Sequence, residues 1–98
     1  PRFYSAGPYL SNEGAGYLAR CSVNAVAVDF PIDKLPPTSQ STIDDFPVHR
    51  LLLGENIPLI ENLINLDRLV GHTFELWALP IKLQGGDGAA ARAVARIL

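Results

Sequence analysis

The chain has 98 residues, of which 48% are hydrophobic and only 18% are charged, and its formal net charge is -2. This length holds one domain or part of one, and the absence of any cluster of basic residues argues against nucleic acid or a membrane surface as a partner. Globular domains average about 25% charged residues. We therefore expect part of the apolar surface to meet another chain or a missing part of the same protein.

The only cysteine, Cys21, rules out an internal disulfide framework and a zinc finger. We expect it to be a small buried residue. The apolar runs are far shorter than the ~18 residues that a membrane-spanning helix needs, and no signal-peptide pattern opens the sequence. These features predict a cytoplasmic protein.

The first half of the sequence predicts a helix followed by a strand. Ser11 is a typical N-cap for a helix that ends near Arg20. The nearly continuous apolar run Val23–Phe30 is typical of a strand that is buried on both faces. The stretch 31–41, which contains three prolines, predicts a surface loop.

A second helix is predicted over Phe46–Leu53, with Pro47 in its first turn and either Asp44 or Asp45 as its cap. The short apolar stretch Ile57–Ile60 predicts a strand that lies at an edge or at a strand start, because it contains a proline.

The last third predicts a strand, a turn and a final apolar segment. Thr73–Leu83 is expected to be a central strand that kinks or ends at Pro80. Gln84–Gly88 predicts a turn. Ala89–Leu98 is better interpreted as a strand, although alanine and arginine also favour a helix. Together these elements predict a mixed α/β (α+β) fold with two main helices and a mixed sheet.

The two histidines are the first candidates for chemistry. His72 lies in a Gly-His-Thr sequence that is typical of a solvated loop. His49 lies on the second predicted helix, and Glu61 follows an apolar strand twelve residues later. A carboxylate there is costly to bury unless it is paired or binds a cation. A helix followed by a strand can place His49 and Glu61 close together at the C-terminal end of the strand. Two interpretations of this pair remain open at this point. His49 and Glu61 have a metal-binding or acid/base role, or Glu61 is simply a solvated residue at the end of a strand.

The glycine-rich stretch Gly85–Gly88 resembles a phosphate-binding loop only superficially. It lacks the Lys-Ser/Thr pair and the following helix of a P-loop. We interpret it as a tight turn that contains Asp87.

Several motifs occur in the order that is found in one family of metal-dependent hydrolases. They are Tyr9–Ser11, Val26–Asp29, Asp45–Leu53, Ile57–Leu63, Asn65–Leu66, Ala78–Lys82, Gly86–Gly88 and Arg92–Val94. On these residues the chain resembles the cyclase family, to which bacterial kynurenine formamidase and isatin hydrolase belong. One motif differs from the family pattern. The family usually has Ser-Pro before Val-Arg, whereas this chain has Ala89-Ala90-Ala91-Arg92 at that place.

The resemblance implies a swivelling β/β/α fold and hydrolysis of a small-molecule amide or lactam by metal-activated water. In two-metal members the positions matching His49 and Glu61 are metal ligands, and an imidazole with a carboxylate suits zinc or manganese. The resemblance assigns no catalytic residue besides these ligands, and the substrate-binding residues are unknown.

The family's main metal motif, His-x-Gly-Thr-His-x-Asp-x-Pro-x-His, is absent from the sequence. Residues 1–98 therefore resemble the C-terminal half of such a hydrolase, forming a single domain or a half-domain that is inactive alone. The expected partner is the missing N-terminal half or further copies of the chain. The alternatives are a non-catalytic remnant that acts as a binding or assembly module, and an α/β domain with similarity of fold only.

Overall fold

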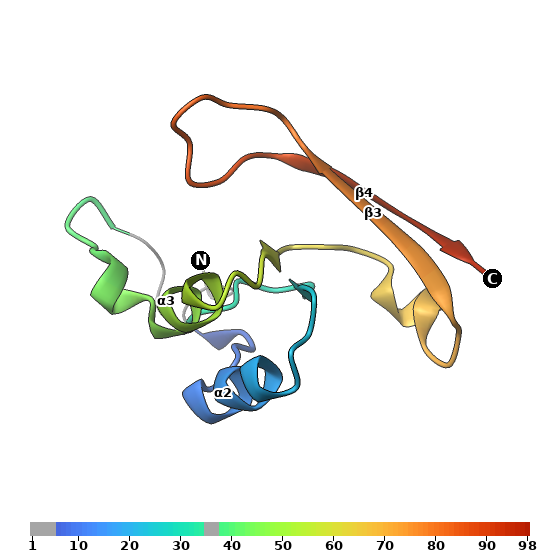
Figure 1. Ribbon diagram of the computed structural model, residues 1–98, viewed down its shortest axis with the longest axis horizontal. Helices are drawn as coiled ribbons and strands as arrows, with labels where there is room; N and C mark the ends of the chain where they lie inside the picture. Colours follow the sequence, from blue (N-terminus) through green and yellow to red (C-terminus); the bar gives the residue numbers. More distant parts are fainter. Residues whose placement is uncertain (1–5, 35–37) are drawn as a thin grey trace. The chain divides into compact units, whose positions relative to one another are not determined.

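The computed structural model describes residues 6–34 and 38–98, so Pro36 and Pro37 of the predicted loop lie outside the described residues. The elements in chain order are α2 (Asn12–Arg20), β1 (Val26–Ala27), the 3-10 turn η1 (Ile43–Asp45), α3 (Pro47–Gly54), β2 (Leu59–Ile60), the 3-10 turn η2 (Leu66–Leu69), β3 (Phe74–Pro80) and β4 (Ala91–Ile97) (Figure 1). The predicted mixed α/β class is confirmed. The swivelling arrangement of the family stays a prediction. The chain divides into two compact units between Leu63 and Ile64.

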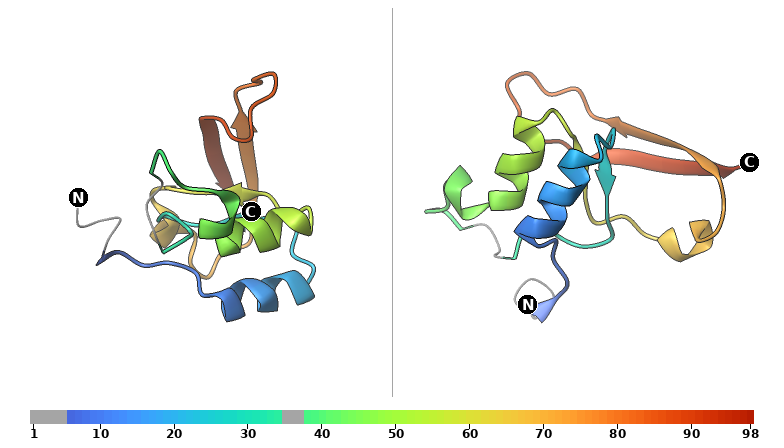
Figure 2. Two further views of the ribbon diagram at one scale, coloured as in Figure 1. Left: turned by 90° about the vertical axis from the view of Figure 1, so that its left-hand side faces the viewer. Right: turned by 60° about the horizontal axis from the view of Figure 1, so that its bottom comes forward.

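The first unit holds two helices that pack side by side, together with a short parallel sheet (Figure 2). In that sheet Val26 of β1 is paired with Leu59 of β2. The buried apolar residues of the described chain all lie in this unit. They are Ala15, Val26, Ile32, Val48, Leu52 and Ile57.

Helix α2 begins and ends where its sequence predicts. The Ser11 hydroxyl accepts a hydrogen bond from the Gly14 amide at 3.0 Å, which satisfies one of the free donors of the first turn. The prediction that Cys21 is buried is wrong. It is the exposed residue that follows Arg20, and its amide donates to the Tyr17 carbonyl at 3.0 Å.

The predicted strand Val23–Phe30 is wrong in length and in burial. Only Val26 and Ala27 form β1, and Ala27 is exposed. Within the described residues β1 pairs with β2 alone, and β2 has just two residues between Pro58 and Glu61. The continuous apolar run therefore forms a short strand with one buried and one exposed side, so an unbroken apolar run did not indicate burial on both faces here.

Neither aspartate that was predicted to cap α3 does so. Asp45 accepts a hydrogen bond from the Thr42 amide at 2.8 Å, within its own 3-10 turn. Asp44 pairs with Arg50 at 2.5 Å on the exposed surface. The residue at the N-cap position is Phe46, whose side chain has no acceptor. The cap prediction fails because the two carboxylates bind other partners, Thr42 and Arg50, and not the first amides of α3.

The second unit is built around an antiparallel ribbon of β3 and β4 (Figure 1). The final apolar segment is therefore a strand, and β3 ends at Pro80 as predicted. The expectation of a central strand is wrong, because β3 pairs only with β4 in the part of the chain that the structure describes. The connecting turn uses Gly85 at φ 72°, a conformation that glycine adopts without steric cost.

The two faces of this ribbon differ in chemistry. The register places eight apolar residues on one face, which we call the apolar ribbon face: Phe74, Leu76, Ala78, Pro80, Ala91, Ala93, Ala95 and Ile97. The other face carries an ion pair between Glu75 and Arg96 at 2.6 Å, and the Arg96 guanidinium lies 5.9 Å from the Trp77 ring centre.

The helices of the described residues are all too short or too polar to span a lipid bilayer.

Candidate functional site

Three segments of the first unit converge at the carboxyl ends of the two parallel strands. Glu61 follows β2 directly, and Asp33 lies on the segment that leaves β1. His49 is the third residue of α3, so it lies in the first turn of the helix. Ligands of open α/β sheets commonly bind outside the carboxyl ends of parallel strands. The local topology therefore brings an imidazole and two carboxylates to a place that is suited to a functional site.

His49 lies between the two carboxylates. Its Nδ1 is 2.6 Å from an Asp33 oxygen, and its Nε2 is 3.4 Å from a Glu61 oxygen. The second Glu61 oxygen accepts a hydrogen bond from the Ile32 amide at 2.6 Å. The side chains of His49 and Glu61 are 29% and 26% exposed, whereas that of Asp33 is 5% exposed. The cluster is therefore anchored at Asp33 and open to solvent on the side of His49 and Glu61.

Asp33 also caps α3 from a distance of fifteen residues in the sequence. One of its oxygens accepts the Val48 amide at 3.0 Å, and the other accepts the His49 amide at 3.1 Å. These are two of the first-turn donors that have no partner inside a helix, and the helix dipole favours a negative charge at this end. The Asp33 carboxylate thus supplies the cap that Phe46 lacks.

The two carboxylates change the acidity of the site. The Glu61 carboxylate, 3.4 Å from Nε2, and then the hydrogen bond to Asp33 raise the pKa of His49 from 6.5 to about 9, although partial burial opposes this rise. The nearby His49 ring lowers the pKa of Glu61 below its usual value, and the hydrogen bond from the Ile32 amide acts in the same direction, against partial burial. In the metal-free chain near neutral pH, His49 is therefore a cation that is paired with anionic Glu61.

These shifts predict how the stability of the metal-free chain depends on pH. The stabilising contribution of His49 is fully present below pH 6.5, its ordinary pKa, and is lost as the pH rises through about 9. The contribution of Glu61 is present above its ordinary pKa of 4.5 and is lost as the pH falls through its lower folded-state pKa. Urea unfolding should therefore give a falling free energy of unfolding between pH 6.5 and 9.

The control for this measurement is the pair of variants His49→Ala and His72→Ala. The alkaline decrease should disappear in His49→Ala and persist in His72→Ala, because His72 is exposed in a turn of the other unit. An equal decrease in both variants would contradict the assignment of this decrease to His49.

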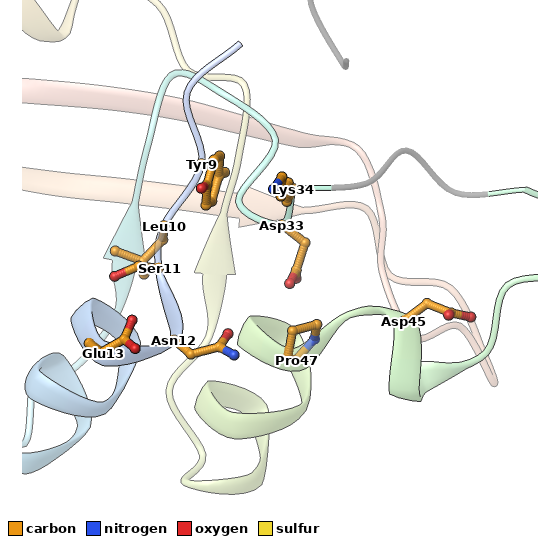
Figure 3. Close-up of a pocket in the computed structure, with 9 residues that line it drawn as sticks. All are labelled: Tyr9, Leu10, Ser11, Asn12, Glu13, Asp33, Lys34, Asp45 and Pro47. Atoms are coloured by element: carbon orange, nitrogen blue, oxygen red, sulfur yellow. The ribbon is translucent and has the colours of Figure 1, made fainter. Parts of the chain in front are cut away.

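A pocket of about 340 Å³ lies beside the cluster (Figure 3). Its lining includes Tyr9, Lys34 and Asp33, but neither His49 nor Glu61. Figure 3 shows Asp33 pointing toward the start of α3 near Pro47 rather than into open space. The pocket therefore meets the cluster of Asp33, His49 and Glu61 only at Asp33, and the paired His49 and Glu61 lie outside its lining.

The structure brings together the two residues that the sequence singled out. Among the other candidates, His72 and Asp87 lie exposed in turns of the second unit. Sequence reasoning missed Asp33, which lies in the stretch interpreted as a surface loop. The available signal was Phe46 at the start of α3: a helix whose N-cap residue carries no acceptor needs one from elsewhere.

The chain matches known enzymes over most of its length. It is 33% identical over 91 residues to kynurenine formamidase of Bacillus mycoides strain KBAB4. The alignment covers 91% of this chain and 40% of the Bacillus mycoides protein. It is also 40% identical over 80 residues to kynurenine formamidase of Salinibacter ruber. That alignment covers 81% of this chain and 34% of the Salinibacter ruber protein. The chain is a relative of the kynurenine formamidases. The Bordetella avium kynurenine formamidase is 34% identical over 82 residues, which covers 84% of this chain and 36% of that protein.

These matches define the extent of the likeness. The chain spans about two fifths of the length of the Bacillus mycoides kynurenine formamidase, and less of the other two. No family model and no solved structure matches it.

Proposed function

We propose that this chain contributes His49 and Glu61 to the active site of a metal-dependent amidohydrolase of the arylformamidase type. The observation that carries the proposal is the meeting of the His49 Nε2 and a Glu61 oxygen, 3.4 Å apart, at the carboxyl ends of two parallel strands. Its support is the similarity of this chain to kynurenine formamidases. The substrate class is a small aryl formamide or a related amide.

The chemistry of the donors suits a divalent cation. Nitrogen from imidazole and oxygen from carboxylate are ligands of zinc and manganese. The Nδ1 of His49 is engaged by Asp33, as the second ring nitrogen of a ligating histidine usually is by a carboxylate or carbonyl. A bound cation supplies Lewis acidity, which lowers the pKa of water toward neutrality for attack on the amide carbonyl.

The described residues provide only part of such a site. A catalytic zinc takes about three protein ligands, and within residues 6–34 and 38–98 no group of three or more histidines, cysteines or carboxylates is placed to hold a metal. The remaining ligands belong, in this proposal, to a polypeptide that corresponds to the part of the relatives that this chain does not match. We place the reaction in the cytoplasm, since a reducing compartment suits the exposed thiol of Cys21.

The apolar ribbon face supports a partner of this kind. An isolated two-stranded ribbon is marginally stable at best in water, and Phe74, Leu76 and Ile97 on this face are 40%, 38% and 47% exposed. We propose that this face packs against the complementary polypeptide. Association of several copies of this chain, or a role as an assembly module without catalysis, are the other outcomes of the test.

Reconstitution tests the proposal. The chain is mixed with the unmatched portion of the Bacillus mycoides relative, complex formation is followed by size-exclusion chromatography, and hydrolysis of N-formylkynurenine is assayed with added Zn²⁺ or Mn²⁺. We expect a mixed complex that hydrolyses the formamide, and neither component should do so alone. A mixed complex without turnover under either metal would overturn the assignment of function, and failure of the two components to associate would overturn the assignment of the partner.

A further inference from the structure

Asp33 is the most buried charged residue in the described part of the chain. Its side chain is 5% exposed and yet accepts three hydrogen bonds, from the Val48 amide, the His49 amide and the His49 ring. No buried polar side-chain atom among the described residues lacks a partner. Burial of a carboxylate is costly unless all its contacts are made, so this arrangement fixes Asp33 in one geometry.

We propose that Asp33 is the positioning residue of the site, and that it sets the place of His49 through both the backbone and the ring. The backbone contacts fix the start of α3, on which His49 lies. The ring contact at 2.6 Å occupies Nδ1 and leaves Nε2 facing Glu61. One carboxylate therefore determines where the imidazole lies and which nitrogen it presents.

A second anchor holds the other side of the pair. The Ile32 amide, adjacent to Asp33 in the chain, donates to Glu61 at 2.6 Å, and the Ile32 side chain is fully buried in the core. The segment leaving β1 thus holds Glu61 with one residue and His49 with the next. Both contacts are made by residues of this chain, so the fold itself holds the imidazole and the carboxylate of the pair in place.

The role toward a cation rests on the proposed function, but the positioning itself does not. Asparagine at position 33 keeps the shape of aspartate and has only one acceptor oxygen. Asparagine cannot accept all three hydrogen bonds that Asp33 accepts. Its side-chain NH₂ group would face either the Val48 amide or the two donors of His49, and two donors cannot form a hydrogen bond with each other. Asp33→Asn should therefore loosen the start of α3 and release the ring, while the apolar core is unchanged.

Nuclear magnetic resonance of the unbound chain tests the inference. In the unchanged protein we expect the His49 Nδ1 proton to exchange slowly with water and that of His72 to exchange rapidly. In Asp33→Asn the His49 Nδ1 proton should exchange rapidly, and the protection of the Val48 and His49 amides should fall by about 10- to 100-fold, as for loss of a hydrogen bond to a charged acceptor. The matched control is Asp29→Asn, an exposed position on the same segment.

The outcomes separate this inference from the proposed function. Exchange of the His49 Nδ1 proton as fast as that of His72 in the unchanged chain would overturn the inference, and this result needs no variant to fold. Unchanged protection in Asp33→Asn would do the same. In the reconstituted complex we expect Asp33→Asn to weaken Zn²⁺ binding by about 10- to 100-fold relative to Asp29→Asn. If the exchange results hold while the complex is inactive, the function fails and the positioning role stands.

Discussion

Replacing His49 with alanine in the reconstituted complex is expected to abolish amide hydrolysis and to weaken Zn²⁺ binding by more than about 100-fold, because loss of an outer-shell partner of a ligand alone costs about 10- to 100-fold. Its Nε2 lies 3.4 Å from Glu61, so its removal eliminates one of the two donors that this chain offers. Glu61→Gln should reduce binding in the same direction, since an amide oxygen is a weaker ligand than a carboxylate.

The controls for this prediction use positions outside the cluster. His72→Ala removes the chain's other histidine, in an exposed turn of the second unit, and should leave both turnover and metal content unchanged. Metal content is measured on the purified complex, and turnover is measured by the release of formate. If His49→Ala retained full turnover and full metal content, the placement of this pair in the active site would be refuted.

The second large effect is expected at Leu52, in the core of the first unit. Its side chain is completely buried, whereas its neighbour Leu53 is 45% exposed. Truncation of a buried leucine to alanine leaves a cavity and costs about 2–5 kcal/mol, while a surface substitution usually changes stability by less than about 0.5 kcal/mol. Leu52→Ala should therefore unfold the first unit at much lower urea than Leu53→Ala.

This comparison also connects the core to the site. Leu52 lies one helical turn from His49 on α3, and its carbonyl accepts the Ile57 amide at 2.9 Å at the approach to β2. Loss of packing at Leu52 should therefore displace both elements that carry the pair. Circular dichroism during urea unfolding is the measurement. Equal midpoints for the two variants would show that α3 is not held by this core.

Local chemistry was sufficient for several features of the fold. Ser11 is followed by a helix because its hydroxyl reaches the amide three residues later, an interaction that depends only on neighbouring residues. Gly85 lies in a turn with a positive φ because glycine meets no steric penalty there. Contacts between residues close in sequence are predictable because the chain between them is too short to offer many alternatives.

The cap of α3 shows where such reasoning fails. Asp44 and Asp45 stand at suitable spacing, but one pairs with Arg50 and the other closes its own turn with Thr42. The carboxylate that caps the helix comes from Asp33, fifteen residues earlier. Phe46 indicates that the acceptor must come from another residue, but the sequence does not say which carboxylate supplies it, because that choice depends on how the segment after β1 crosses the start of α3.

The sequence by itself determined the residue types of the site, a histidine and a glutamate at helix-then-strand spacing, and the family to which the chain is similar. Only the tertiary structure decided that a buried aspartate joins them, that Nε2 of His49 faces Glu61, and that Val23–Phe30 forms just a two-residue strand. The physical reason is common to all three. Hydrogen bonding and burial at these positions depend on partners that are distant in sequence, and only folding brings those partners together.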